Sequence, residues 1–135
     1  MRLFSEEALA TTTIYLEARG ESTEGKIAVG RIIRNRMAEK FFSDGTVAGT
    51  VLRPWQFSAW DSDTPGRAAA ANLDDTDPLV AACLDAWRLS ALDDAGIKDA
   101  LLYYAPLAVK RAPNWAIERL FMIAIGRHRF YRAEP

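Results

Sequence analysis

Two consecutive helix signatures occupy the first forty residues, and they limit the folds open to this chain more than any other feature. Ser5 is a favourable N-cap with two glutamates after it, which predicts a helix from there to about residue 18. Gly20 is expected to end this helix, because glycine is common just beyond a helix C-terminus. A second helix is expected from Ser22 or Thr23 to about residue 40. The chain therefore begins as two helices joined by a loop of a few residues.

The apolar residues of both segments recur at helical spacing, which predicts the buried faces. In the first helix, Leu9, Thr13 and Leu16 are expected to face inward, with Glu17 at the border of that face. In the second helix, the repeating positions are Ala28, Val29, Ile32, Ile33, Arg36 and Met37. Gly30 weakens that helix by about 1 kcal/mol relative to alanine, which suggests the close approach of another backbone, such as that of the first helix.

The middle of the chain contains turns and one more helix. Residues 41–76 are rich in turn-forming residues, with a short helix or a brief strand pair expected over 46–52. Asp77 followed by Pro78 predicts a helix N-terminus, with the cap at the aspartate and proline in the first helical position. This helix is expected to run to about residue 92.

The last third of the chain contains short extended segments. Residues 100–105 are expected to form a short strand or an extended loop. The apolar segment 120–125 fits a helix or a strand, and Gly126 with the aromatic segment 128–131 favours a hairpin. We therefore expect a single domain over residues 1–135, of the α+β class, mainly helical and with a small β element.

The composition narrows the classes of partner. The chain has 135 residues and a formal net charge of −1, whereas proteins that bind a polyanion usually carry a basic excess, so no nucleic-acid partner is expected. Cys83 is the one cysteine, which excludes an intramolecular disulfide, and its place on the apolar face of the third helix predicts a core residue. No segment approaches the roughly 18 apolar residues of a membrane span, so no stable membrane insertion is expected. The acidic N-terminus does not read as a signal peptide.

One carboxylate stands out once other chemistries are set aside. The chain lacks the HExxH spacing of zinc hydrolases, a nucleophile elbow and a phosphate-binding glycine loop, so neither a metal nor a cofactor is expected. Glu17 has apolar and aromatic neighbours, and burial of a carboxyl against such a wall raises its pKa toward the range of a general acid. The alternative is a glutamate at a helix end, paired with Arg19 or with an arginine of the second helix.

No second catalytic carboxylate is evident. The aspartates between residues 61 and 77 lie in polar, turn-rich sequence and are expected to be solvated or to cap turns. Most glycosidases need two carboxylates. A mechanism with one carboxylate remains open where the substrate supplies its own nucleophile.

The order of several sequence blocks resembles the cell wall hydrolases of the spore-cortex-lytic-enzyme type. The blocks are Thr13-Ile14-Tyr15-Leu16-Glu17-Ala18-Arg19-Gly20-Glu21, Gly25-Lys26-Ile27-Ala28-Val29, Asn35-Arg36, Thr46-Val47-Ala48-Gly49-Thr50-Val51, Gln56-Phe57-Ser58, Leu102-Tyr103-Tyr104, Trp115 and Ile125-Gly126-Arg127-His128-Arg129-Phe130-Tyr131. The resemblance covers nearly the whole chain, and its first block is the most specific. It implies a fold similar to lysozymes and lytic transglycosylases, with a groove for a glycan strand.

The resemblance also implies an activity and a set of site residues. Family members cleave the β-1,4 bond between N-acetylmuramic acid and N-acetylglucosamine, many of them as lytic transglycosylases that leave an anhydro-muramic end. Their catalytic acid precedes Ala-Arg-Gly-Glu and corresponds to Glu17, and this chemistry needs no second carboxylate. Substrate contacts are expected from Gln56, Ser58, Tyr103, Tyr104, Glu21, Trp60 and His128. The alternatives are core packing for the tyrosines and Trp60, a backbone-bonded loop residue for Gln56, and a structural or rim residue for His128.

Four further positions bear on the resemblance. Asn35 and Arg36 match the family pattern, and we expect them to act mainly as structural support at the end of the second helix. Ala105 stands where relatives often have asparagine after the tyrosines, and Arg127 stands where they often have asparagine before the histidine. Either departure could alter contacts with the sugar.

Peptidoglycan glycan strands are therefore the expected partner of a monomeric enzyme. A bare domain without a wall-binding module or an export signal fits a phage endolysin made in the host cytoplasm. It would act in the periplasm or cell wall after release through a holin, or be carried in a virion. Two alternatives stay open: a hydrolytic muramidase that uses water, and a non-catalytic glycan- or nucleic-acid-binding module that uses Arg31, Arg34 and Arg36.

Overall fold

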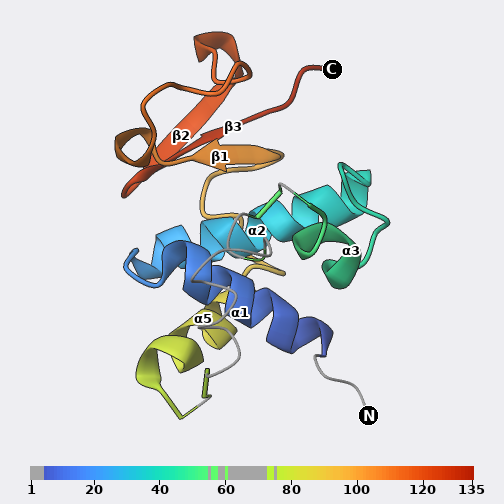
Figure 1. Cartoon of the computed structure of the whole chain (residues 1–135), viewed down its shortest axis with the longest axis vertical. Helices are drawn as coiled ribbons and strands as arrows, with labels where there is room; N and C mark the ends of the chain where they lie inside the picture. Colours follow the sequence, from blue (N-terminus) through green and yellow to red (C-terminus); the bar gives the residue numbers. More distant parts are fainter. Residues whose placement is uncertain (1–4, 55, 58–59, 61–72, 75) are drawn as a thin grey trace.

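A computed structural model describes residues 5–54, 56–57, 60, 73–74 and 76–135 of the chain (Figure 1). The helices are α1 (Glu6–Ala18), α2 (Thr23–Glu39), α3 (Val47–Val51) and α5 (Pro78–Leu89). The strands are β1 (Leu102–Tyr104), β2 (Phe121–Ile125) and β3 (His128–Tyr131), with short 3-10 turns η2 (Pro106–Ala108) and η3 (Glu118–Leu120). Figure 1 shows the sheet at one end of the molecule and the helices at the other. The expected α+β, mainly helical class is confirmed.

The first two helices begin where their caps predict. The hydroxyl of Ser5 accepts a hydrogen bond from the backbone N–H of Ala8, and the hydroxyl of Ser22 accepts one from Gly25. Both bonds satisfy backbone N–H groups that have no partner within the helix. The helices α1 and α2 pack against each other and against α5, and this three-helix contact contains most of the core.

Most of the buried positions expected in α1 and α2 are confirmed. Leu16 and Met37 are only half-buried at the edge of the core, whereas Ile14, which was not among the expected positions, is fully buried. A Cβ atom on Gly30 would lie 3.0 Å from the hydroxyl oxygen of Ser90 and 3.2 Å from the Cδ1 atom of Ile14. The close approach at Gly30 therefore comes from side chains of two elements, and not from the backbone of α1.

Helix α5 begins at the predicted proline, with the Asp77 carboxylate accepting a hydrogen bond from the N–H of Leu79. It ends at Leu89, about three residues before the expected end. Cys83 is fully buried in the core, as predicted, and burial raises the pKa of its thiol to about 11. The segment expected to be a short helix or a strand pair is helix α3.

The sheet is antiparallel, with strand order β1-β3-β2. The predicted hairpin is confirmed, with Gly126 in its turn at a φ of 57°, a left-handed conformation that favours glycine. Strand β1 forms within the segment 100–105, where Tyr103 pairs with Phe130 of β3. In the part of the chain that the structure describes, no helix is long and apolar enough to cross a bilayer.

Candidate active site

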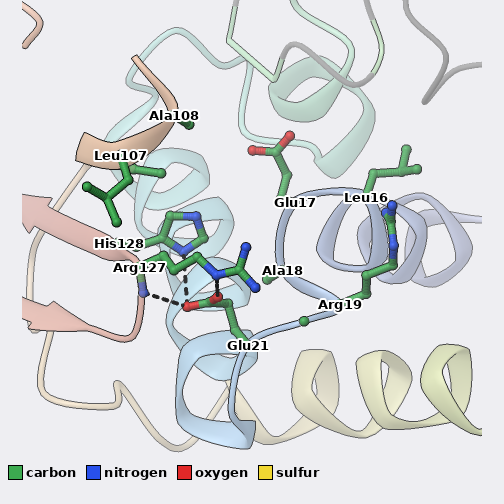
Figure 2. Close-up of a pocket in the computed structure, with 11 residues that line it drawn as sticks. Leu16, Glu17, Ala18, Arg19, Glu21, Leu107, Ala108, Arg127 and His128 are labelled. Carbon is green, nitrogen blue, oxygen red and sulfur yellow. Dashed lines mark hydrogen bonds and ion pairs between the residues drawn. The ribbon is translucent and has the colours of Figure 1, made fainter. Parts of the chain in front are cut away.

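A pocket of about 520 Å³ lies where the end of α1 meets the hairpin and the segment after β1 (Figure 2). The loop from α1 to α2 supplies one wall, and the turn of the hairpin and η2 supply the others. Its lining consists of residues 16–21, Ala105, Leu107, Ala108, Arg127 and His128. Glu17, Glu21 and His128, three of the predicted site residues, therefore share one cavity although more than a hundred residues separate the first from the last.

Glu17 sits in the last turn of α1, half-buried, and is held by a tyrosine of the sheet. The hydroxyl of Tyr103 donates a hydrogen bond of 2.6 Å to Oε1 of Glu17. Burial of the hydroxyl, together with the charge of Glu17 and the hydrogen bond to it, raises the pKa of Tyr103 well above its usual value. The phenol therefore stays protonated and acts as the donor, which fixes the orientation of the carboxyl group.

Arg36 lies behind this pair, in the core-facing stripe of α2, and is only 4 % exposed. Its Nε donates a hydrogen bond of 2.8 Å to the carbonyl of Leu101, just before β1, and its Nη1 lies 3.5 Å from Oε1 of Gln56. Burial lowers the pKa of Arg36, and the charges of Tyr103 and Glu17 oppose this shift. Arg36 therefore joins α2, the Gln56 loop and the start of β1 next to the candidate acid.

Asn35 extends this support. Its side-chain amide donates hydrogen bonds of 2.8 Å and 2.9 Å to the carbonyls of Lys98 and Ala100. These bonds hold the segment that leads into β1, which positions Tyr103. The contacts of Asn35 and Arg36 agree with the expected structural role, and Arg36 adds a buried positive charge beside the site.

Glu21 forms the opposite part of the pocket and is bound to the hairpin turn. Its side chain is 7 % exposed, its Oε1 accepts a hydrogen bond of 3.0 Å from the N–H of Arg127, and its Oε2 lies 3.5 Å from Nε of Arg127. A Cβ atom on Gly126 would lie 2.2 Å from Oε1 of Glu21, so only glycine leaves room for this carboxylate. Figure 2 shows these contacts between the loop after α1 and the hairpin.

His128 lies on the same wall and is buried. Its Nδ1 is 3.9 Å from Oε1 of Glu21 and has no hydrogen-bond partner among the described residues. Burial lowers the pKa of His128, and the positive charge of Arg127 lowers it further, whereas the negative charge of Glu21 raises it. Its ring also contacts that of Tyr103 edge to face, with centroids 5.0 Å apart. The imidazole thus links the hairpin turn to the tyrosine that holds Glu17.

The structure separates the other predicted residues from this pocket. Neighbouring strand residues project to opposite faces, so Tyr104 points away from Tyr103 and packs against Trp115 and Tyr131.

Trp60 is buried in the core, where its indole N–H donates to the hydroxyl of Thr13. This placement favours a packing role over a sugar platform. Gln56 accepts a hydrogen bond from Arg36 but does not line the pocket, as far as the described residues show. Ser58 lies outside the described residues.

The arginines offered as a binding surface are used within the fold. The guanidinium of Arg34 lies over the ring of Trp87 at 3.7 Å and donates to Ser90 and to the carbonyl of Trp87. Arg31 donates to the carbonyl of Ser90. These contacts satisfy carbonyl groups at the C-terminus of α5. They disfavour the binding-module interpretation, because the guanidinium groups it requires already bind the protein itself.

Sequence reasoning gave Arg36 a structural role but did not predict its place behind Glu17 and Tyr103, and it did not predict that Leu107 and Ala108 line the pocket. For Arg36, the available signal was a charged residue at a core-facing position of an otherwise apolar helical stripe, which requires a buried partner. Across the described residues, no group of three or more His, Cys, Asp or Glu side chains is arranged to hold a metal ion.

Comparison with known proteins places this geometry in a family. The family described as Cell Wall Hydrolase matches residues 20–131, beginning just after Glu17. A spore cortex-lytic enzyme of Oceanobacillus iheyensis is 33% identical over 122 residues, which cover 90% of this chain and 40% of that protein. The chain thus spans about two-fifths of that relative's length.

Two solved structures are similar over nearly the whole chain. The catalytic domain of the Bacillus cereus SleB protein aligns with a TM-score of 0.70 and 27% identity, over 94% of this chain and 89% of that one. The catalytic domain of the germination-specific lytic transglycosylase SleB from Bacillus anthracis aligns with a TM-score of 0.70 and 25% identity, over 98% and 99%. The expected lysozyme-like, single-domain fold is thus confirmed. The family match over residues 20–131 includes the loop after α1, Arg36 and the hairpin. The chain therefore belongs to the Cell Wall Hydrolase family.

Proposed function

We propose that this protein cleaves the glycan strands of peptidoglycan between N-acetylmuramic acid and N-acetylglucosamine, as a lytic transglycosylase with Glu17 as its acid and base. The observation that carries the proposal is the placement of Glu17 on a pocket wall, with its carboxyl group oriented by the Tyr103 hydroxyl. Membership of a cell wall hydrolase family and similarity to a lytic transglycosylase domain support it.

The chemistry needs one carboxyl group in two protonation states. The Tyr103 hydroxyl donates to Oε1 in both states and orients the carboxyl group. Glu17 gives its proton to the glycosidic oxygen, the bond from that oxygen to the muramic anomeric carbon breaks, and the glucosamine leaves with a free hydroxyl. The Glu17 carboxylate then takes the proton from the 6-hydroxyl of the muramic sugar, whose oxygen bonds to the anomeric carbon. No water is consumed, and the product is an anhydro-muramic end.

The second carboxylate of the pocket supports this reaction over hydrolysis. In a hydrolase with two carboxylates, the second one acts as a nucleophile or activates water. Glu21 is instead bound to the N–H and the guanidinium of Arg127 and is almost fully buried. This arrangement favours a structural role for Glu21 and leaves Glu17 as the single acid and base.

The product identifies the reaction. Mass spectrometry of purified peptidoglycan digested with the protein is expected to show muropeptides with anhydro ends, each lighter by one water than the reducing-end products of a muramidase. Reducing ends alone would replace the proposed reaction with hydrolysis at the same bond.

Substitution of the acid tests the site. We expect Glu17→Gln to lower the rate of turbidity loss of purified walls by roughly 100- to 10,000-fold, the usual contribution of a general acid. Glu118→Gln is a matched control, because Glu118 is exposed and pairs with Arg129 away from the pocket. Clearance by Glu17→Gln at the wild-type rate would refute the role of Glu17 as the acid, whereas no clearance by the wild type itself would favour a non-catalytic binding module.

We also propose that the protein is a monomeric phage endolysin that reaches the wall through a holin. Expression in the cytoplasm of a Gram-negative host is expected to cause lysis when a holin is expressed with it and little lysis otherwise. Equal lysis in both strains would contradict the holin route. Size-exclusion chromatography with light scattering measures the oligomeric state.

A further inference from the structure

The charges at the mouth of the pocket differ in sign from those within it. Both carboxylates of the lining are turned inward: Glu17 is half-buried and bound to Tyr103, and Glu21 is only 7 % exposed. The exposed charged side chains of the lining are Arg19 and Arg127, and that of Arg127 is 71 % exposed. An approaching ligand therefore meets positive charge, although the whole chain has a net charge of −1.

Arg127 is held at the pocket by its surroundings. Its backbone N–H donates to Glu21, and its guanidinium lies beside the same carboxylate. Its Nη2 is 3.3 Å from the point where a Cβ atom on Gly20 would lie, so the absence of a side chain at Gly20 gives the guanidinium its space. In the view of Figure 2, the Arg127 guanidinium lies between His128 and Ala18, with part of it directed away from Glu21.

Arg19 stands on the α1 side of the same lining. Its guanidinium lies over the ring of Tyr15 at 5.1 Å, and its Nη1 is 3.5 Å from the carbonyl of Tyr15. Like Arg127, it is fixed on one side and exposed on the other. Guanidinium groups bind carboxylates through paired hydrogen bonds, so the exposed Arg127 at the pocket mouth, with Arg19 farther off at the end of α1, favours a ligand with carboxylates.

The facing wall has the opposite character. Ala105, Leu107 and Ala108 come from η2 and the residue before it, and the side chain of Leu107 is 94 % exposed although it lines the pocket. Apolar side chains of this kind contact methyl groups well and offer no partner to a carboxylate. The pocket thus combines a cationic edge with an apolar wall.

We propose that this pocket recognises the carboxylate-bearing substituent of the muramic acid next to the cleaved bond, with Arg127 and Arg19 as the specificity-determining residues. The inference rests on the proposed function, because it places the muramic sugar beside Glu17. N-acetylglucosamine is uncharged, whereas muramic acid carries a lactyl group whose carboxyl is either free or extended by a peptide with further carboxylates and methyl groups. The two sources share the same chemistry, a carboxylate beside methyl groups, which matches the two walls.

The test compares three preparations of one batch of purified walls. The first is native, the second has its carboxylates converted to neutral amides with carbodiimide and methylamine, and the third has its peptides removed by an amidase, which leaves the lactyl carboxylate. Initial rates of formation of new anhydro-muramic ends, a product common to all three preparations, are measured for the wild type, Arg127→Gln, Arg19→Gln and Arg132→Gln. Arg132 is the matched control, because it is an exposed arginine that lines a separate pocket near the C-terminus.

The decisive quantity is the ratio of the rate on native walls to the rate on amidated walls. We expect a wild-type ratio of about three to ten at low salt, falling as salt screens the exposed charges. Arg127→Gln and, to a smaller extent, Arg19→Gln should bring this ratio toward one, mainly through KM. Arg127→Lys should restore part of it, and Arg132→Gln should keep the wild-type ratio.

The outcomes separate this inference from the proposed function. A wild-type ratio near one, or a loss in Arg127→Gln of the same size on both preparations, overturns the carboxylate inference while cleavage itself stands. Failure of the wild type to cleave any preparation overturns the proposed function and the inference with it. If the wild-type ratio is as expected, the rate on peptide-free walls identifies the carboxylate that is bound. A rate like that on native walls assigns the contact to the lactyl carboxylate, and a rate like that on amidated walls assigns it to the peptide.

Discussion

The two faces of the small sheet are built from alternate residues of the same strands, yet they serve different purposes. The inner face carries Tyr103, His128 and Phe130, whose rings contact one another and lead to Glu17. The outer face carries Tyr104, Tyr131 and Arg129, which pack with Trp115 and Phe121. Both faces are aromatic and both include an arginine contact. The difference is that only the inner face meets the end of α1, so position relative to α1 decides which aromatic residues join the site.

The largest expected difference between the two faces is in how much their arginines, Arg36 and Arg129, stabilise the fold. Arg36→Met should lower the free energy of unfolding by about 2–4 kcal/mol, because it leaves the buried carbonyl of Leu101 without its donor and removes a buried charge contact. Arg129→Met is the control on the outer face, and its effect should be much smaller, since the Arg129 side chain is partly exposed. Urea denaturation of both variants measures this, and equal losses would contradict the distinction.

Arg36 also has an expected effect on activity that a purely structural residue lacks. Its charge lies close enough to Glu17 to interact with it. Loss of a nearby positive charge favours the protonated form of a carboxyl group. The alkaline limb of the kcat/KM profile should therefore move to higher pH in Arg36→Met, provided the variant is assayed at a temperature where it is folded. An unshifted limb would limit Arg36 to structural support.

The hairpin turn next to the pocket provides the second prediction. Gly126→Ala should cost about 2–3 kcal/mol, because alanine is strained at positive φ and its Cβ would displace the Glu21 carboxylate. Gly96→Ala is the control: φ there is 83° and the nearest atom, Cδ1 of Ile123, would be 3.4 Å from the new Cβ, so only the backbone strain of about 1 kcal/mol is expected. Thermal unfolding compares the two, and equal shifts in Tm would show that Glu21 contributes nothing to the turn.

The two adjacent tyrosines give the sharpest test of activity. Tyr103→Phe removes a hydrogen bond to an ionisable group, worth roughly 1.5–3 kcal/mol, so kcat/KM should fall about 10- to 100-fold. Tyr104→Phe should change kcat/KM by less than about twofold, because its hydroxyl lies on the outer face among Tyr131 and Arg129. Comparable losses in the two variants would place the substrate on both faces of the sheet and would favour the original prediction for Tyr104.

The smallest expected effect concerns pH and the single histidine of the chain. Burial lowers the pKa of His128 below its ordinary value of 6.5, so the unfolded chain binds a proton before the folded protein does as the pH falls. Stability is therefore retained above about pH 6.5 and decreases below it. His128→Gln should reduce this decrease in Tm between about pH 6.5 and 5. An identical pH dependence in the variant would contradict the assignment.

Much of the fold followed from local sequence signals. The caps predicted at Ser5, at Ser22 or Thr23, and at Asp77 locate three helix N-termini, with Ser22 as the cap of α2, because capping depends on residues within one turn. Gly126 correctly predicts the hairpin. The end of α5 was overestimated by about three residues. Its C-terminal carbonyls are bound by Arg31 and Arg34 of another helix, and such a long-range contact leaves no local signal.

The candidate site divides in the same way. The sequence by itself determined that Glu17 ends a helix beside an apolar wall, and the order of the family blocks pointed to it as the acid. It placed both Tyr103 and Tyr104 among the residues expected to contact the substrate. Only the tertiary structure decided which tyrosine meets Glu17, that Trp60 enters the core, and that Arg36 is buried beside the pair. The physical reason is that periodicity assigns residues to faces, whereas the packing of a distant element decides which face becomes a site.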